Sequence, residues 1–272
     1  MPKIHASAII SGDASIADDV VIGPGCVITG TVRLEAGVEL IGNVYLNGPV
    51  TIGPRTRVYP GACVGFEPQD VKFKPGMITA GVVIGADCLI REHVTLHAAT
   101  KPDRPTRVGD RCFLMVNAHM GHDAVIGNDV TLVNNVAMGG HAEIGDKVIM
   151  GGNAVIHQFT RIGKLAFVGG MSGLSTDVPP YCMSAGRNRL VGLNIVGMRR
   201  NGVPRDQIQV VRQAFRDALM PFLPRDEQLA ILNRHAADSP QVREIADFVA
   251  ECKRSVTPFR TNSRLADATE GE

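Results

Sequence analysis

An aliphatic residue recurs at every sixth position over most of the chain. The series runs from Ile4 to Val64, resumes from Ile84 to Leu96, and continues from Val108 to Leu174. A small or slim residue lies two positions before many of these aliphatic residues, as Ala118 does before Met120. A period of six matches neither the 3.6 residues of a helical turn nor the two of an ordinary strand. It fits one short strand plus one corner, and hexapeptide repeats of this kind predict a parallel β-helix.

A second period of 18 residues lies on top of the first. Glycines recur at this spacing, and each is followed by a polar or charged residue: Gly109, Gly127, Gly145 and Gly163. Because Gly, Asn and Asp tolerate positive φ, we expect these residues to form sharp corners. Asn117, Asn135 and Asn153 share the spacing and are predicted to stack as a ladder of side-chain amides. Three hexapeptides therefore form one coil of a triangular prism, with roughly nine coils at ~4.8 Å each.

The repeat is interrupted twice, at residues 65–83 and 97–107, both rich in Pro, Lys and Arg. Loops that leave a regular solenoid usually carry binding residues. The repeat ends near Ser175, and the remaining chain has the pattern of helices opening at 203–206 and continuing near 226–236 and 240–253. We therefore divide the chain into a β-helical prism, 1–186, and a helical domain, 187–272, and we expect residues 261–272 to be frayed.

The flat faces of such a prism bear on its assembly. The faces alternate apolar and polar residues, and no helix covers them in the predicted architecture. Uncovered faces and open coil edges favour packing against another prism. We therefore predict a cyclic homotrimer.

Composition narrows the range of partners and compartments. The net charge is +1, so no global field indicates nucleic acid. Arginines nevertheless cluster in the tail, as a solvated face or as a docking surface for an acidic partner: Arg187, Arg189, Arg199, Arg200, Arg205, Arg212 and Arg216. The six cysteines lack metal-ligand spacing, and three of them occupy the small-residue position of the repeat, so we expect buried thiols. With no signal peptide and no apolar 18-residue run, the chain is expected to be soluble and cytoplasmic.

Five of the eight histidines lie in the central part of the chain: His97, His119, His122, His141 and His157. Asp123 and His141 are 18 residues apart, so they should stack on adjacent coils beside His122. Three interpretations compete: corner histidines satisfied by the backbone, a metal site, and a general base. No Cys or Glu joins the group, which disfavours zinc. A neutral imidazole held by Asp123 would be ready to take a proton from a hydroxyl, and direct transfer between two bound substrates needs no covalent enzyme intermediate.

Several segments occur in a characteristic order: NAHMGHD at 117–123, GGH at 139–141, IHQF at 156–159, VGGMSG at 168–173, DVPPY at 177–181 and GLNIVGMRRNG at 192–202. Together with the repeats, this order resembles the acyl-ACP–UDP-N-acetylglucosamine O-acyltransferases of lipid A synthesis, and the match extends from about residue 4 to the last helices. The resemblance implies a left-handed prism, a homotrimer with clefts between subunits, and an acyl carrier protein as partner. It implies transfer of a 3-hydroxyacyl chain to the 3-hydroxyl of UDP-N-acetylglucosamine. No metal or other cofactor is expected, because the phosphopantetheine thioester is a co-substrate.

The resemblance also assigns roles to individual residues. His122 matches the general base and Asp123 its orienting carboxylate, while the N–H of Gly140 matches the donor to the thioester oxyanion. Residues matching the sugar and acyl cleft are His119, His141, His157 and Gln158, and those matching contacts to sugar and phosphate are Gln69, Asp70 and Lys72. Asn194, Arg199 and Arg200 match the segment near the nucleotide and the carrier protein. Gly170 lies on the implied path of the acyl tail and is expected to limit its length. The chain departs from the family pattern at Val196, at Asn201 and in the string His97–Thr100.

Three other functions stay open. The sister N-acyltransferase of the same pathway has a uridine-binding domain before its prism, and we expect none here because the repeat begins at Ile4. A relative acting on a 3-amino sugar nucleotide would form an amide. A structural or γ-carbonic-anhydrase-like zinc prism would need three histidines from two subunits, and the long helical tail disfavours it.

Overall fold

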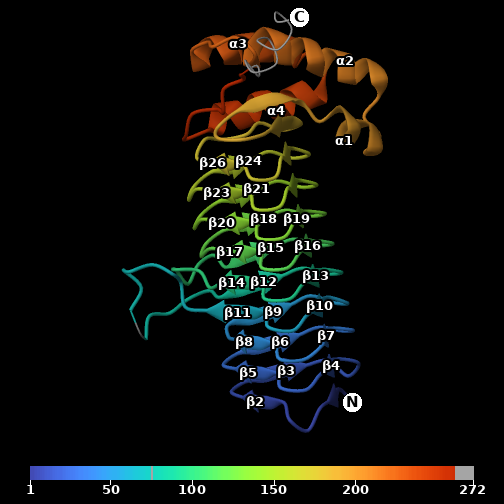
Figure 1. The fold of residues 1–272 in the computed structure, drawn as a ribbon, viewed down its shortest axis with the longest axis vertical. Helices are drawn as coiled ribbons and strands as arrows, with labels where there is room; N and C mark the ends of the chain where they lie inside the picture. Colours follow the sequence, from blue (N-terminus) through green and yellow to red (C-terminus); the bar gives the residue numbers. More distant parts are fainter. Residues whose placement is uncertain (75, 261–272) are drawn as a thin grey trace, which may run out of the picture.

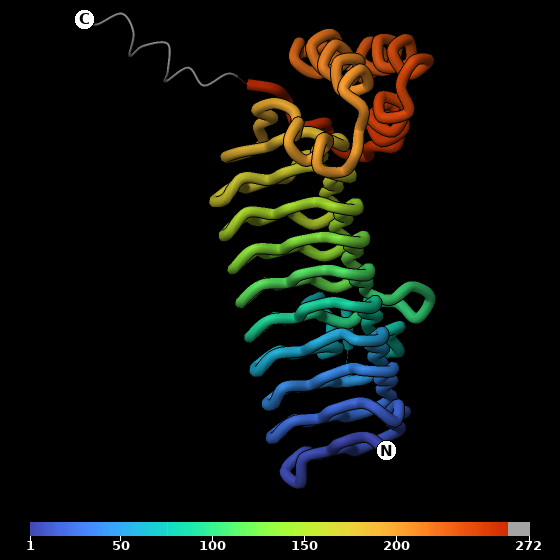
Figure 2. The backbone as a smooth tube through the Cα atoms, turned by 90° about the vertical axis from the view of Figure 1, so that its right-hand side faces the viewer, coloured from blue at the N-terminus to red at the C-terminus, as the bar shows by residue number. Residues whose placement is uncertain are grey.

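The chain forms a tall three-sided prism of short strands with a group of helices on one end (Figure 1). The computed structural model describes residues 1–74 and 76–260. The N-terminus lies at the far end of the prism, and two loops leave its wall near the middle (Figure 2). No helix among the described residues is long and apolar enough to cross a membrane.

Three sheets form the walls of the prism, and each chain turn adds one strand to each sheet. The first sheet contains β1 (Lys3–Ile4), β4 (Val21–Ile22), β7 (Glu39–Leu40), β10 (Arg57–Val58), β13 (Leu89–Ile90), β16 (Phe113–Leu114), β19 (Thr131–Leu132), β22 (Ile149–Met150), β25 (Phe167–Val168), β27 (Cys182–Ser184) and β28 (Leu190–Leu193). The second contains β2 (Ile9–Ser11), β5 (Val27–Thr29), β8 (Tyr45–Asn47), β11 (Cys63–Phe66), β14 (Thr95–His97), β17 (His119–Met120), β20 (Ala137–Met138), β23 (Val155–Ile156) and β26 (Gly173–Leu174). The third contains β3 (Ala14–Ile16), β6 (Val32–Leu34), β9 (Val50–Ile52), β12 (Val82–Ile84), β15 (Thr106–Val108), β18 (Val125–Ile126), β21 (Glu143–Ile144) and β24 (Arg161–Ile162).

Neighbouring strands are parallel and pair in the 18-residue register of the sequence repeat, as where Leu114 pairs with Leu132 and Leu132 with Met150. The exception is β28, which runs antiparallel to β27. The predicted parallel β-helix followed by helices is confirmed. The first sheet is slightly taller than the roughly nine coils expected, because β27 adds a parallel rung after the hexapeptide series has ended.

The two inward positions of each hexapeptide form a continuous core. Ala118 and Met120, two residues apart, are both buried, and the same holds for Val130 with Leu132. Small and large side chains thus alternate along each inward wall, which fills a narrow triangular interior at high density. Ile4, the first residue of the series, is 44% exposed because no coil lies below it.

The corners differ from the prediction in one respect. Gly109, Gly127 and Gly145 do not have positive φ; the left-handed residues lie two positions later, at Arg111, Asp129 and Lys147. The glycines are required by close approach, since a Cβ on Gly109 would lie 2.4 Å from the carbonyl oxygen of Gly127 on the next coil. The polar residue after each glycine bonds vertically instead: Asn128 Oδ1 accepts the N–H of Asp110 at 2.8 Å.

The asparagine ladder occupies the corner between the first and second sheets. Asn117, Asn135 and Asn153 have φ of 60°, 61° and 58°, so each is the left-handed residue of its corner. Asn117 Nδ2 donates to Asn135 Oδ1 at 3.2 Å. Asn tolerates this conformation better than most residues, which explains its recurrence there.

The two loops predicted to carry binding residues leave the prism at the same corner, between the second and third sheets. The first connects β11 to β12 and the second connects β14 to β15. They contact each other, since Ala99 N–H donates to Gly81 O and Ala80 N–H donates to Lys101 O. A bulge between Val64 and Phe66 marks the point where the first loop departs.

The helical part consists of α1 (Ile195–Arg200), α2 (Arg205–Ala214), a π-helical extension η1 (Phe215–Leu219), α3 (Arg225–His235) and α4 (Pro240–Glu251). The last three predicted helices are present, whereas α1 was not predicted from the sequence. The division predicted between residues 186 and 187 falls in the turn between β27 and β28, and residues 261–272, predicted to be frayed, lie outside the described residues.

Side chains and backbone fasten the helices to the end of the prism. On α4, Glu244 pairs with Lys164 Nζ at 3.0 Å and accepts the hydroxyl of buried Tyr181. The segment after α4 returns to the prism and forms bridges from Val256 to Asp177 and from Phe259 to Leu190. The six cysteines are free thiols, five of them buried.

Candidate active site on the histidine edge

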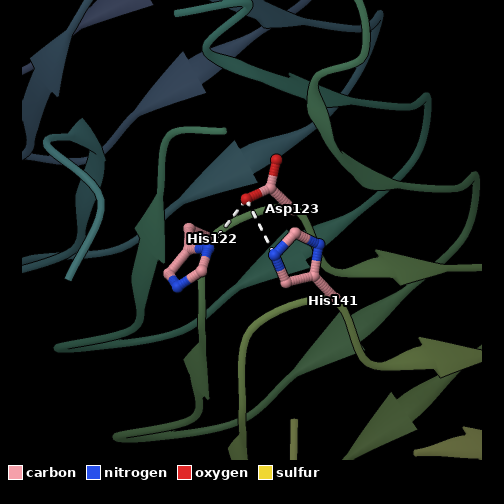
Figure 3. A group of neighbouring side chains, drawn as sticks. All are labelled: His122, Asp123 and His141. Atoms are coloured by element: carbon pink, nitrogen blue, oxygen red, sulfur yellow. Dashed lines mark hydrogen bonds and ion pairs between the residues drawn. The ribbon is translucent and has the colours of Figure 1, made fainter. Parts of the chain in front are cut away.

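The corner between the second and third sheets carries most of the predicted site residues. We call it the histidine edge; it consists of residues 121–124, 139–142 and 157–160 on three successive coils. His122 Nδ1 lies 2.7 Å from Asp123 Oδ2, and both side chains are only 12% exposed. Figure 3 shows both rings of the cluster directed at the same carboxylate oxygen. An ionised carboxylate can only accept hydrogen bonds, so Nδ1 carries the proton and Nε2 of His122 presents a lone pair. This is the arrangement of a neutral general base with a fixed tautomer.

His141 lies one coil above Asp123, in the same left-handed corner position. Its φ is 58° against 60° for Asp123, and its Nε2 lies 3.6 Å from Asp123 Oδ2. The ring is edge-on to His122 at 5.2 Å between centroids and stacks on Phe159 at 4.6 Å and 5°. Phe159 was not predicted as a site residue. It is the next member of the 18-residue series through Asp123 and His141, so the spacing contained a signal for it.

Gly140 lies directly above the His122 ring. A Cβ at this position would be 2.6 Å from His122 Cε1, so any other residue would displace the imidazole. The N–H of Gly140 has no acceptor among the described residues, while its carbonyl accepts from Phe159 N–H. A backbone N–H without an internal acceptor, beside a general base, is placed to stabilise an oxyanion.

Thr100, from the second loop, holds the carboxylate. Its N–H donates to Asp123 Oδ1 at 3.1 Å and its hydroxyl donates to Oδ2 at 2.8 Å. Burial opposes ionisation of Asp123, but hydrogen bonds from His122 and Thr100 outweigh it and lower the pKa of this carboxyl below its usual value. Asp123 therefore stays ionised at neutral pH. Thr100 was not predicted as a site residue, because nothing in a loop sequence indicates which coil it will contact.

His119 lies on β17, on the second sheet just before the histidine edge. Its Nδ1 bonds the hydroxyl of Thr95 at 2.8 Å, and its ring is edge-on to His97 at 5.5 Å. Burial, with the nearby His97, lowers the pKa of His119, which keeps this imidazole neutral. His97 Nδ1 in turn donates to Glu67 O at the base of the first loop at 2.7 Å.

His157 and Gln158 lie one coil further up and are exposed. Arg254, from the segment after α4, reaches this coil: Nη1 donates to Ser175 O at 3.0 Å and Nη2 lies 3.5 Å from His157 Nδ1. His157 also lines a groove of about 450 Å³ that runs up the second sheet past Val155 and Gly173 to Met171.

Other predicted residues are not brought to the histidine edge of the same chain. Gln69, Asp70 and Lys72 lie in the first loop, where Asp70 Oδ1 accepts the N–H of Lys72 at 2.9 Å. Within the described residues, none of the three has a hydrogen bond or ion pair to the histidines. Gly170 lies at the corner between the first and second sheets, next to Met171 in the groove.

The last three predicted residues lie around α1. Asn194 has a structural role: its Oδ1 caps α1 through Gly197 N–H, and its Nδ2 donates to Leu165 O. Arg199 and Arg200 are exposed in the last turn of the helix. At the positions that depart from the family pattern, Val196 is exposed and Asn201 ends α1 while accepting from Lys147 Nζ at 2.8 Å.

His122, Asp123 and His141 form a group whose ligand atoms lie within 4.8 Å of one another, which is close enough for a metal ion. Two ligands at about 2.0–2.2 Å from a tetrahedral zinc ion stand ~3.3 Å or more apart. The 2.7 Å between His122 Nδ1 and Asp123 Oδ2 is instead the length of a charge-assisted hydrogen bond. The geometry therefore fits a proton-sharing dyad, and a metal-free site stays a prediction.

Comparison with known proteins gives a consistent result. Residues 177–257 match the family model for domain 2 of UDP N-acetylglucosamine O-acyltransferase. The chain is 48% identical over 248 residues to the acyl-[acyl-carrier-protein]–UDP-N-acetylglucosamine O-acyltransferase of Azorhizobium caulinodans, covering 90% of this chain and 91% of the relative. It is 39% identical to the enzyme of the same name from Thermodesulfovibrio yellowstonii, covering 94% and 99%. The crystal structure of UDP-N-acetylglucosamine O-acyltransferase from Moraxella catarrhalis superposes with a TM-score of 0.89 at 38% identity, covering 93% and 99%.

Proposed function

The chain belongs to the family of acyl-ACP–UDP-N-acetylglucosamine O-acyltransferases, and on that premise we propose how its own residues perform the reaction. The protein transfers a 3-hydroxyacyl chain from acyl carrier protein to the 3-hydroxyl of UDP-N-acetylglucosamine, the first step of lipid A biosynthesis. The observation that carries this assignment is the dyad of His122 and Asp123 beneath the N–H of Gly140. It supplies a base and an oxyanion donor without a nucleophilic side chain.

The reaction needs one proton acceptor and one donor to an oxyanion. His122 Nε2 takes the proton of the sugar hydroxyl, whose oxygen attacks the thioester carbonyl carbon. The negative charge that develops on the carbonyl oxygen is stabilised by the N–H of Gly140. When the C–S bond breaks, the phosphopantetheine thiolate takes the proton from the imidazolium. Asp123 stays ionised throughout and stabilises the protonated ring, consistent with its lowered pKa. No metal or other cofactor enters these steps, since the activated acyl group arrives as a thioester.

The substrate-binding roles are proposed from the family resemblance and from position. His119 and His141 flank the dyad, and His157 and Gln158 continue the edge upward. Gln69, Asp70 and Lys72 are assigned to sugar and phosphate, and Lys72 is exposed and cationic. Asn194, Arg199 and Arg200 are assigned to the region of the nucleotide and the carrier protein, with the side chain of Asn194 acting through its cap on α1.

We propose a homotrimer in which the cleft lies between neighbouring subunits. Two observations support it. The first-loop residues Gln69, Asp70 and Lys72 stand apart from the histidines of their own chain, so a neighbouring chain is needed to complete the site. Apolar side chains also stay exposed on the first and second sheets: Ile149 is 40% exposed and Val155 48%. Cytoplasmic localisation is proposed because both proposed substrates are water-soluble metabolites of that compartment.

A product analysis tests the reaction. The purified protein is incubated with 3-hydroxyacyl-ACPs of several chain lengths and an equal mixture of UDP-N-acetylglucosamine and its 3-amino analogue. We expect a singly acylated UDP-N-acetylglucosamine, identified by mass spectrometry, that loses its acyl chain in mild alkali as an ester does. An alkali-stable amide as the main product would favour the 3-amino acceptor. The absence of product, or loss of turnover on adding a zinc chelator, would contradict the mechanism.

A further inference from the structure

Asp123 is held by a residue outside its own coil. Thr100 lies 23 residues before it, in the loop between β14 and β15. Its N–H and hydroxyl donate to different oxygens of the carboxylate, at 3.1 Å to Oδ1 and 2.8 Å to Oδ2. Two donors from one residue on two oxygens fix the rotation of the carboxylate plane. That rotation decides whether Oδ2 faces His122.

We propose that Thr100 is a positioning residue for the catalytic dyad, an inference that rests on the proposed function. Oδ2 accepts from both Thr100 and His122, at 2.8 and 2.7 Å. Without the hydroxyl, the carboxylate can rotate toward His141 Nε2, which already lies 3.6 Å from Oδ2. A rotated carboxylate would leave Nδ1–H of His122 without its partner, so Nε2 would no longer be fixed as the base.

The backbone around Thr100 ties the dyad to both loops. Ala98 N–H donates to Phe66 O at 2.9 Å, and Ala99 N–H donates to Gly81 O at 3.2 Å. Thr79, in the first loop, donates its hydroxyl to Ala99 O. The first loop carries the residues assigned to the sugar and phosphate. Its packing therefore sets where Thr100 stands, and through Thr100 how Asp123 is turned.

The alternative is that Thr100 only stabilises the loop. Thr79→Val is the matched control, because it removes a threonine hydroxyl that supports the same loop and does not touch Asp123. Thr100→Val removes the hydroxyl on the carboxylate at nearly constant volume, and Thr100→Ser restores it. Melting temperatures are measured for all variants, and Thr100→Ala replaces the valine variant if that variant does not fold.

We expect Thr100→Val to lower kcat about 10- to 100-fold, the scale of a misplaced catalytic group. KM for UDP-N-acetylglucosamine should change less than about twofold, because no substrate contact is removed. The hydroxyl is one of the groups that lower the pKa of Asp123. Its loss raises that pKa, so the acid limb of the kcat–pH profile should move to higher pH. Thr100→Ser should keep the parent profile, and Thr79→Val should leave the acid limb in place.

Two results would overturn the inference: a Thr100→Val variant with the parent kcat and pH profile, or a Thr79→Val variant that shifts the acid limb equally. Failure of the proposed function looks different. In that case the parent protein and Thr100→Ser would also give no acylated sugar nucleotide.

Discussion

At the scale of single residues, the site depends on which side chains occupy the left-handed corner positions. Asp123, His141 and Phe159 have φ of 60°, 58° and 63°, and each projects from the same place on successive coils. A side chain at this position stands beside those of the coils above and below, about 4.8 Å away. The repeat thus builds a column consisting of a carboxylate, an imidazole and a phenyl ring, with His122 held against its lowest member.

Removal of the base is the direct test at this scale. His122→Ala should lower kcat by ~10²–10⁴-fold, the usual contribution of a positioned general base. KM for either substrate should change little, because the imidazole acts on the proton and not on binding. Single-turnover and steady-state kinetics measure the effect, with melting temperature and oligomeric state followed in parallel.

His5→Ala is the matched control, since His5 is exposed in the first coil, far from the histidine edge. It should keep the parent kcat. A His122→Ala variant with unchanged kcat would show that another group takes the proton.

The parts of the site that the sequence predicted are those that follow the repeat. His122 and Asp123 are neighbours in the chain, and His141 follows Asp123 by one coil, so spacing alone placed them together. Thr100 and Arg254 reach the edge from a loop and from the segment after α4. Their contacts depend on how long non-repeating segments fold back, which a period does not encode. Gly170 and Arg199 follow the family order of motifs, but the described chain places them on other surfaces.

At the scale of elements, short strands and long loops divide the work. The strands vary little, and their inward residues fix the coil spacing to which every corner must conform. Close approach of the coils explains why glycines recur where φ is negative, as at Gly109. The sequence pattern identified those positions correctly but suggested the wrong cause, because a glycine required for positive φ and one required for contact look alike in a sequence.

Gly170 is a test of function at the level of one corner. Neither Gly170 nor Gly152 below it has positive φ, so turn geometry does not require glycine there. A Cβ on Gly170 would lie 3.2 Å from Gly152 O, a close contact that a small shift relieves. The adjacent Met171 is 78% exposed and lines the groove that begins at His157. A long side chain at Gly170 would therefore fill the far end of a path for an acyl tail.

We predict that the parent prefers a long 3-hydroxyacyl chain and that Gly170→Met shifts the preference to shorter ones. Each buried CH₂ contributes about 0.8 kcal/mol, so space lost for four methylenes weakens selection of the long chain by roughly 3 kcal/mol, over a hundredfold. Competition between acyl-ACPs of mixed length measures the change. Gly170→Ala should give a smaller shift in the same direction. An unchanged profile in the methionine variant would mean that the tail does not reach this corner.

At the scale of the whole molecule, the sequence predicted the prism more completely than the helical end. Each coil repeats the same local instruction, so errors do not accumulate from Ile22 to Leu174. The helices instead are held by particular contacts between distant residues, such as Glu244 with Lys164 and Tyr181. The short helix α1 was missed because six residues give too little periodicity to detect, and its start depends on the cap by Asn194.

The helical end carries a local positive charge on a chain whose net charge is only +1. Arg205, Arg212 and Arg216 are spaced by seven and four residues along α2 and η1, so they share one face, opposite the buried Ile208 and Val211. Arg199 and Arg200 are exposed on the neighbouring α1. Among the described residues, none of these five arginines forms an ion pair with a carboxylate. A surface of unpaired cations fits the acidic carrier protein.

Salt should therefore act differently on the two substrates. The Debye length falls to ~8 Å at physiological ionic strength, so attraction between two protein surfaces is screened as salt rises. We expect KM for acyl-ACP to rise steeply with salt and KM for UDP-N-acetylglucosamine to rise much less, because a small ligand inside a cleft is screened less than an open surface. Initial rates over a series of NaCl concentrations measure both. Arg205→Ala with Arg212→Ala should flatten the acyl-ACP dependence, whereas Arg33→Ala, near the opposite end of the prism, should leave it as steep as in the parent. Equal salt dependence for both substrates would count against docking on this face, since screening would then report only the charge of the shared cleft.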